Sequence, residues 1–145
     1  NNDWGTNWGD DGTDGTLDPG GANIVVSAGT YFATVNMNDL TYTLEPVQNV
    51  WGLVGGAYND WGATADAQFK RDWSKPFNDV WILENVTLID GEYKFRANND
   101  WGTNYGDSDG DGILELNGGN LNTTAGTYSF VLDFSNPDAP TYTKN

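Results

Sequence analysis

The sequence contains no cysteine and no histidine. Without cysteine there is no disulfide framework, no thiol nucleophile and no thiolate-ligated zinc. Without histidine the chain lacks Ser-His-Asp chemistry and imidazole metal ligands. Basic residues are also scarce, because six lysines and arginines stand against 21 acidic residues, and the formal net charge is −15. A surface this acidic repels phosphate backbones and anionic lipid, so we expect no nucleic acid partner.

Two further shortages limit the function. No apolar run approaches the length of a membrane span. Carboxylates outside turns are few, because nearly all acidic residues lie among glycine and asparagine, and only Glu84 and Glu92 fall in expected strands. A glycosidase needs two carboxylates at a controlled separation, one of them in an apolar pocket. We therefore expect no enzymatic activity.

The residues that are abundant indicate a folded β-protein. Aromatic residues make up 14% of the 145 residues, which excludes a disordered acidic tail. Nineteen glycines, with many Asn, Asp and Thr residues, suit short strands joined by tight turns. This composition is typical of secreted, β-rich proteins.

The most informative feature is an internal repeat. NNDWGTNWGD at 1–10 recurs as NNDWGTNYGD at 98–107, an offset of 97. AGTY at 28–31 recurs at 125–128 with the same offset, and TYT at 41–43 recurs at 141–143. A unit of just under 100 residues is therefore repeated.

This periodicity predicts two domains. Residues 1–46 form the C-terminal part of a first repeat, and residues 47–145 form a complete second repeat. The short first copy has two interpretations: a simple chain boundary, or a half-sandwich completed by strands of another chain through self-association. A half-sandwich alone would expose sheet edges and an apolar face.

Alternating or β-branched segments predict the strands, and no segment has a convincing helical period. Asp90-Gly91 predicts a hairpin turn between two of them. About seven short strands in one repeat predict an all-β, immunoglobulin-like antiparallel β-sandwich, with one partial and one complete tandem copy. The expected strands are 23–28, 30–37, 40–44, 49–54, 79–88, 91–97, 113–116, 120–124, 127–134 and 140–143.

The segment 91–97 alternates sharply. Tyr93, Phe95 and Ala97 are expected on the core face, which places Lys94 and Arg96 on the other face. These cations either pair with nearby aspartates or donate hydrogen bonds to a polyhydroxylated ligand.

Tryptophan supplies the matching aromatic signal. Asn-Asp-Trp-Gly occurs three times, ending at Gly5, Gly62 and Gly102, and turn-forming residues flank each Trp. A loop indole can cover the apolar face of a pyranose, or it can cap the end of the sandwich core. Trp51 and Trp81 fall in expected strands and are assigned to the core.

The motifs GEYKFRA at 91–97, NNDWGTNYG at 98–106 and AGTYSF at 125–130 resemble the signature of SusE/SusF-type domains. The resemblance covers about 47–145, and 1–46 resembles the latter half of a second domain. It implies a non-catalytic, surface-exposed lipoprotein of the Bacteroidetes outer membrane. Such proteins carry tandem β-sandwiches that bind starch or other glycans beside a SusC/SusD-type importer.

The resemblance also implies a set of site residues. Lys94, Arg96, Trp101 and Asn104 match the motif positions of the family, and Trp61 and Trp73 are aromatic candidates by position. Together with the residue types themselves, this predicts a glycan site in which Trp residues stack on sugar rings and polar residues donate hydrogen bonds. The full predicted set is Trp61, Trp73, Lys94, Arg96, Asn99, Trp101, Asn104 and Tyr105.

An acidic loop departs from the family pattern. Asp107, Asp109 and Asp111 follow the spacing Asp-x-Asp-x-Asp-Gly, which is typical of Ca²⁺ loops. Gly118 stands where an EF-hand has its bidentate Glu, so an EF-hand is not expected. The alternatives are a non-helical Ca²⁺ loop and a solvated acidic turn.

Three hypotheses follow. The first is a non-catalytic polysaccharide- or oligosaccharide-binding module, on the extracellular face of the outer membrane or secreted, that requires no cofactor. The second is an assembly subunit completed by a neighbouring chain, and the third is a Ca²⁺-stabilised adhesin domain.

Overall fold

The computed structural model describes residues 4–76 and 79–145. Residues 1–3, which open the first copy of the repeated motif, lie outside the described residues. The described chain is all-β with antiparallel sheets, and none of it forms a helix long and apolar enough to cross a membrane. It divides into two compact units, Asn1–Gln48 (unit 1) and Asn49–Asn145 (unit 2), two residues beyond the expected boundary.

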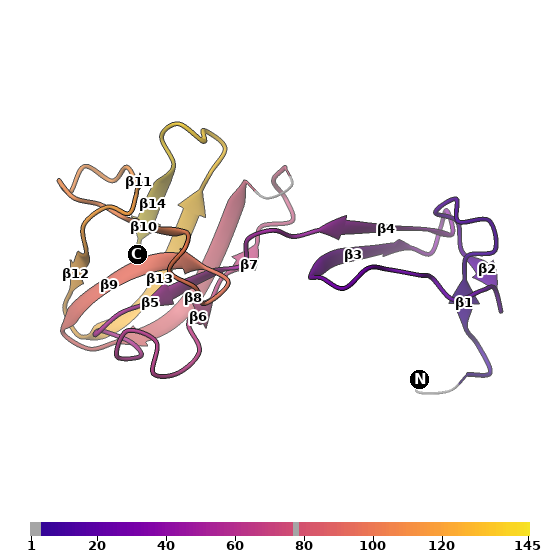
Figure 1. Ribbon diagram of the computed structural model, residues 1–145, viewed down its shortest axis with the longest axis horizontal. Helices are drawn as coiled ribbons and strands as arrows, with labels where there is room; N and C mark the ends of the chain where they lie inside the picture. Colours follow the sequence, from indigo (N-terminus) through magenta and orange to yellow (C-terminus); the bar gives the residue numbers. More distant parts are fainter. Residues whose placement is uncertain (1–3, 77–78) are drawn as a thin grey trace. The chain divides into compact units, whose positions relative to one another are not determined.

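Unit 2 is a β-sandwich made of two antiparallel sheets (Figure 1). The larger sheet has six strands in the order β11-β10-β9-β5-β6, with β12 also paired to β9. Its strands are β5 (Trp51–Val54), β6 (Ala67–Gln68), β9 (Gly91–Ala97), β10 (Asn104–Gly106), β11 (Glu115–Leu116) and β12 (Leu121–Thr123). The smaller sheet has the order β14-β13-β8-β7, with β7 (Lys70–Arg71), β8 (Val80–Leu88), β13 (Gly126–Asp133) and β14 (Thr141–Lys144).

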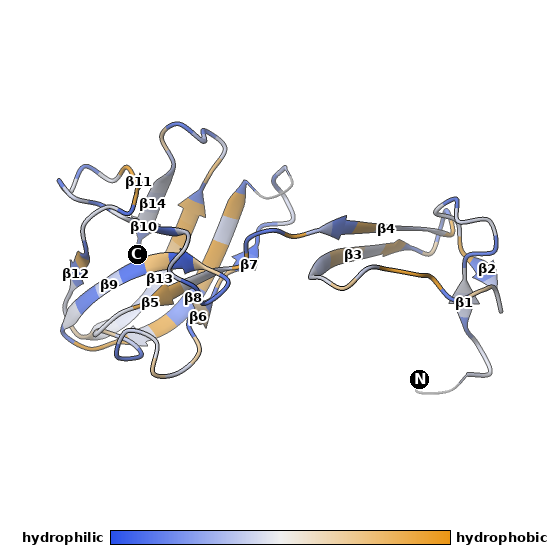
Figure 2. Cartoon of the chain, in the orientation of Figure 1, coloured by the Kyte–Doolittle hydropathy of each residue, from blue (hydrophilic) through white to orange (hydrophobic). Residues whose placement is uncertain are grey.

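The core lies between these sheets, and Figure 2 shows apolar residues along β8 and β13. Phe95 of the larger sheet meets Phe130 of the smaller one with ring centroids 6.0 Å apart, and both side chains are fully buried. Burial of such a side chain contributes about 1.5–3 kcal/mol. Trp51 and Trp81 are also buried, which confirms their assignment to the core.

Two expectations about local structure are wrong. Asp90-Gly91 does not close a hairpin, because β8 pairs with β13 and β7 while β9 pairs with β5, β10 and β12. The turn instead carries the chain from one sheet to the other. The expected strand at 23–28 is absent, because its counterpart β12 is held by β9 and the described part of unit 1 has no strand equivalent to β9.

Unit 1 consists of two small sheets. One pairs β1 (Trp8–Gly9) with β2 (Asp18–Pro19), and the other pairs β3 (Tyr31–Asn36) with β4 (Thr41–Pro46). Two-stranded sheets are marginally stable alone. Unit 1 therefore depends on its turns and side-chain hydrogen bonds more than unit 2 does.

The hydrogen bonds of the two units recur at the offset of the sequence repeat. The amide of Asp10 donates to the carbonyl of Ala22 at 2.9 Å, and the amide of Asp107 donates to the carbonyl of Gly119 at 3.1 Å. Gly106 is required there, because a Cβ at this position would collide with the Gly119 carbonyl oxygen. The strands β1, β2, β3 and β4 thus correspond to β10, β11, β13 and β14.

Candidate functional site

The candidate site begins with the alternation of β9. Tyr93, Phe95 and Ala97 are buried on the core side, as expected. Lys94 and Arg96 occupy the opposite face of the sheet, beside Asn104 of β10 and Gly52 of β5 in the register. Both cations are nevertheless buried, with exposed fractions of 9% and 5%. The loop between β5 and β6 lies against Arg96, because a Cβ at Gly62 would come within 2.8 Å of its Nη2.

Arg96 is held by a buried carboxylate. Its Nε and Nη2 donate to the two oxygens of Asp66 at 2.6 and 2.8 Å. Asn59 donates a third hydrogen bond to Asp66 at 3.0 Å, and the side chain of Asp66 has no exposed surface. A fully hydrogen-bonded bidentate pair of this kind compensates much of the cost of burying both charges. Arg96 was expected either to pair with an aspartate or to donate hydrogen bonds to a ligand, and in the structure it pairs with Asp66.

Above this pair lies an aromatic platform made of Trp61 and Trp101. The guanidinium carbon of Arg96 is 4.6 Å from the ring centroid of Trp101, a cation–π contact. Trp61 lies beside Trp101 with centroids 6.1 Å apart and ring planes tilted by 38°. Trp101 remains 42% exposed and Trp61 is half-buried. Arg96 covers one face of Trp101, so the exposed part of the indole belongs to its other face and its edges.

The backbone of Trp61 is strained. Its φ is +60°, a left-handed conformation that bulky residues rarely adopt and that costs on the order of 1–3 kcal/mol. The amides of Gly62 and Ala63 both donate to the carbonyl of Asn59, which fixes this turn. Strained residues of this kind cluster at ligand sites.

Two predicted asparagines position the platform. The amide nitrogen of Asn104 donates to the carbonyl of Trp101 at 3.0 Å and to the side chain of Asn117 at 2.9 Å. The side-chain oxygen of Asn99 accepts a hydrogen bond from the amide of Asp66 at 3.0 Å, while Asn99 itself is exposed. Asn104 is buried and serves the loop, whereas Asn99 still presents its side chain at the surface.

Lys94 differs from Arg96. No other described residue forms an ion pair or a hydrogen bond with its ammonium group. Burial lowers the pKa of Lys94, since a charged ammonium is disfavoured away from water. Its hydrogen-bonding capacity is thus unused on the same face of β9 that carries Arg96.

The structure does not bring the other two predicted aromatic residues to this platform. Tyr105 is opposite Phe95 in the register and packs against Trp51 and Phe134, with centroids 5.6 and 5.7 Å away. It therefore belongs to the core side of the sheet. Trp73 follows β7 in the smaller sheet, is 57% exposed, and lies under the guanidinium of Arg71 at 4.4 Å.

The acidic loop is organised around Asp107. Its two carboxylate oxygens accept hydrogen bonds from the amides of Gly110 and Gly112 at 2.6 and 3.0 Å. Burial acts to raise the pKa of Asp107, but these backbone hydrogen bonds outweigh it and hold the pKa below its usual range. Oxygen atoms of Asp107, Asp109, Asp111 and Glu115 lie within 4.8 Å of one another, beside a hollow of about 260 Å³.

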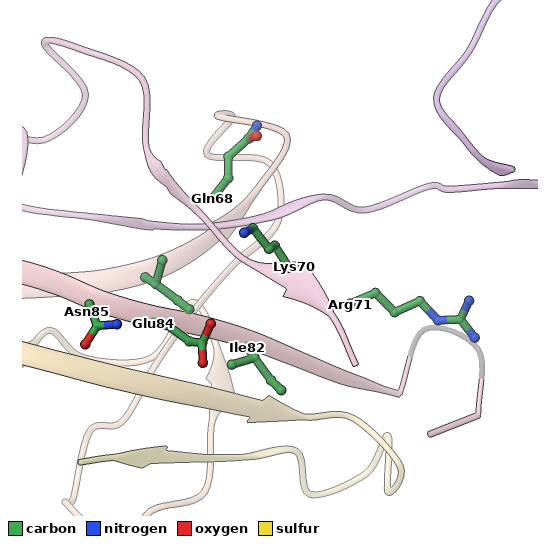
Figure 3. A pocket seen from close by; sticks show the side chains of 7 residues that line it. Gln68, Lys70, Arg71, Ile82, Glu84 and Asn85 are labelled. Carbon is green, nitrogen blue, oxygen red and sulfur yellow. The ribbon is translucent and has the colours of Figure 1, made fainter. Parts of the chain in front are cut away.

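A separate groove of about 400 Å³ borders β7 and β8. Figure 3 shows Gln68, Lys70, Ile82, Glu84 and Asn85 around it, with Arg71 extending away from the others. None of its lining residues is aromatic, so the groove offers no stacking surface among the described residues.

Two residues of the site had no signal in the sequence. Asp66 and Asn59 lie in an irregular loop. Only the fold brings Asp66 to Arg96, and Asn59 to Asp66.

No family model, curated protein or solved structure matches this chain.

Proposed function

We propose that unit 2 is a non-catalytic carbohydrate-binding module whose sugar-stacking surface is the pair Trp61 and Trp101. The observation that carries this proposal is a water-accessible pair of indoles fixed on a buried ion pair. Trp101 is 42% exposed and yet held by Arg96, which Asp66 holds in turn. A preorganised aromatic surface binds a sugar face without an ordering cost at the moment of binding.

The net charge of the chain and the tilt between the two indoles restrict the class of glycan that the site would bind. The net charge of −15 disfavours anionic glycans and leaves neutral ones. Because the two indole planes are tilted by 38°, a glycan lying over both has to bend between successive rings. We therefore favour a neutral, curved polysaccharide such as starch over a flat one.

Lys94 and Asn99 supply the polar contacts in this proposal, and Arg96 and Asn104 act as positioning residues. The ammonium of Lys94 is unpaired among the described residues, and Asn99 is exposed. The resemblance of 47–145 to SusE/SusF-type domains supports the same function. With it we propose an extracellular location, on the outer membrane or secreted, beside a SusC/SusD-type importer.

Isothermal titration of the full chain tests the proposal with a soluble α-linked glucan, and with xylan, β-glucan and mannan for comparison. We expect measurable binding to the α-glucan, weakened by about tenfold in Trp101→Ala, which corresponds to about 1.4 kcal/mol. Trp73→Ala is the matched control, because it removes a more exposed indole from the other sheet. Equal loss in both variants, or no binding to any glycan, would contradict the proposal.

A further inference from the structure

Unit 1 has an open side where unit 2 has a strand. In unit 2, β13 is paired on both edges, with β14 and with β8. In unit 1 the equivalent strand β3 pairs with β4 alone among the described strands. The equivalent of β10, which pairs with β9 in unit 2, is β1, and the one described strand that pairs with β1 is β2.

The backbone of the open edge can be assigned residue by residue. In unit 2, the amides of Ser129 and Asn145 each donate to the other's carbonyl at 2.9 Å. Antiparallel ladders alternate, so the next hydrogen-bonded pairs follow at every second residue. At the repeat offset, the residues of β3 that are hydrogen-bonded to β4 are Phe32, Thr34 and Asn36. The amides between them, those of Ala33 and Val35, therefore point to the unpaired edge of β3.

The side chains at this side are uncovered in the same pattern. Val35 is 60% exposed, whereas its counterpart Leu132 is fully buried. Ile24 is 36% exposed, whereas its counterpart Leu121 is 5% exposed opposite Tyr93 of β9. Met37 is 53% exposed, and its counterpart Phe134 stacks on Trp51 at 4.6 Å. Figure 2 shows the apolar stretch that precedes β3 in unit 1.

We propose that unit 1 is a strand acceptor whose occupant is a first-half repeat segment, with the chemistry of residues 49–97. The repeat itself identifies the occupant. In unit 2 that segment provides β5, β8 and β9, which cover the counterparts of Ile24, Val35 and Met37. This inference stands independently of carbohydrate binding.

The charge of unit 1 makes a second copy of unit 1 a poorer occupant than a first-half segment. Residues 1–48 contain seven acidic and no basic residues, whereas 49–97 contain seven acidic and five basic ones. Two copies of unit 1 repel each other more strongly than unit 1 repels a first-half segment.

The test joins a second copy of residues 49–97 directly ahead of residue 1 of the full chain, which reproduces the natural junction between 97 and 98. Amide hydrogen exchange is then measured at Ala33 and Val35. We expect exchange about 100-fold slower than in the unextended chain, because these amides gain strand partners. The amides of Phe32 and Thr34 face β4 already and should change less.

The matched control carries Leu83→Asp and Phe95→Asp in the added segment only. In unit 2, Leu83 lies opposite Phe130 in the register of β8 and β13, and Phe95 meets Phe130 across the core. Slow exchange with the intact segment and fast exchange with the control support the proposal. Equal exchange in both extended chains overturns it. Concentration-dependent protection in the unextended chain, with a dimer in light scattering, would also overturn it in favour of a second copy.

Discussion

Arg96 illustrates how a residue on the outer face of a sheet becomes almost fully buried. It pairs with Asp66, contacts Trp101, and lies under the loop that contains Gly62. Its charge is thereby used to fix an aromatic ring rather than to contact solvent. Each member of such a cluster depends on the others, because a buried charge is tolerated only with its partner.

This dependence gives the first prediction. Asp66→Leu should lower the free energy of unfolding by about 3–5 kcal/mol, because it leaves the Arg96 charge buried and unpaired. The double variant with Arg96→Met should recover much of that loss, since both charges are then removed. Urea unfolding of the two single variants and the double variant measures the coupling. Additive effects would show that the pair does not act as a unit.

Lys94 gives the second prediction. Folding lowers its pKa, so the unfolded chain binds more protons between the two pKa values, and stability rises with pH across that interval. At neutral pH the buried charge of Lys94 is a cost, so Lys94→Met should raise Tm.

The same variant should weaken glycan binding, because we propose the Lys94 ammonium as a hydrogen-bond donor. Stability gained with affinity lost is the signature expected of a functional residue. Titration and thermal unfolding of Lys94→Met check both effects, and Lys70→Met is the control for loss of an exposed positive charge. Unchanged affinity in Lys94→Met would remove this residue from the site.

At the scale of elements, the acidic loop is a structure that each unit builds separately. Asp10 accepts hydrogen bonds from the amides of Gly12 and Gly15 and from the hydroxyl of Tyr42. In unit 2, Asp107 accepts hydrogen bonds from the amides of Gly110 and Gly112, and Gly112 is the counterpart of Gly15. The buried carboxylate thus closes its own loop in both units, and in unit 1 the hydroxyl of Tyr42 also links the loop to β4.

This arrangement predicts an acid-sensitive loop. The folded pKa of Asp107 is below the usual value of about 3.9, so the stability that it provides is present above that pH. It is lost as the pH falls through the folded pKa. Denaturant unfolding at several pH values should therefore show a decrease in stability below about pH 4 that is smaller in Asp107→Asn. An identical decrease in the variant would assign the effect to other carboxylates.

The alternative hypothesis for the same loop is that it binds Ca²⁺. A ligand that binds only the folded state raises Tm, so a Ca²⁺ loop would melt lower in EDTA. We expect EDTA to leave Tm unchanged, because the Asp107 oxygens already accept hydrogen bonds from the loop amides. A higher Tm in calcium that Asp109→Asn abolishes would instead establish a bound ion.

Longer elements could be predicted from the sequence, and the shortest ones could not. The alternation of 91–97 predicted β9 and the faces of Tyr93 and Lys94. Strands of two residues, such as β1, β2, β6 and β7, carry no periodicity and exist only through their neighbours. Asp66 was missed for the same reason, because its partner lies 30 residues away and nothing local indicates it.

At the scale of the whole molecule, the two units differ in how much core they contain. Among the described residues, the fully buried large side chains, such as Trp81, Phe95 and Phe130, all belong to unit 2. Unit 1 combines two two-stranded sheets with exposed apolar side chains. Segments with little buried apolar surface open more easily, whereas the core strands open only with global unfolding.

Limited proteolysis with thermolysin should therefore cut unit 1 first and leave a fragment that covers about 49–145. Trypsin is unsuitable, because residues 1–69 contain no lysine or arginine. Mass spectrometry of the early products identifies the cleavage sites. Early cuts within β8, β9 or β13 would contradict this order of stability.

The acidic hairpin also has a consequence for engineering. Residues 10–22 and 107–119 form the same loop with different acceptors: the amide of residue 11 donates to Asp18, and the amide of residue 108 donates to Glu115. The next link uses the Asp11 carboxylate in one unit and the Ser108 hydroxyl in the other. The loop geometry is the same although the acceptor side chains differ. Residues 10–22 and 107–119 should therefore replace each other in chimeras, and the stability of the chimeras would tell which acceptor side chains can be exchanged.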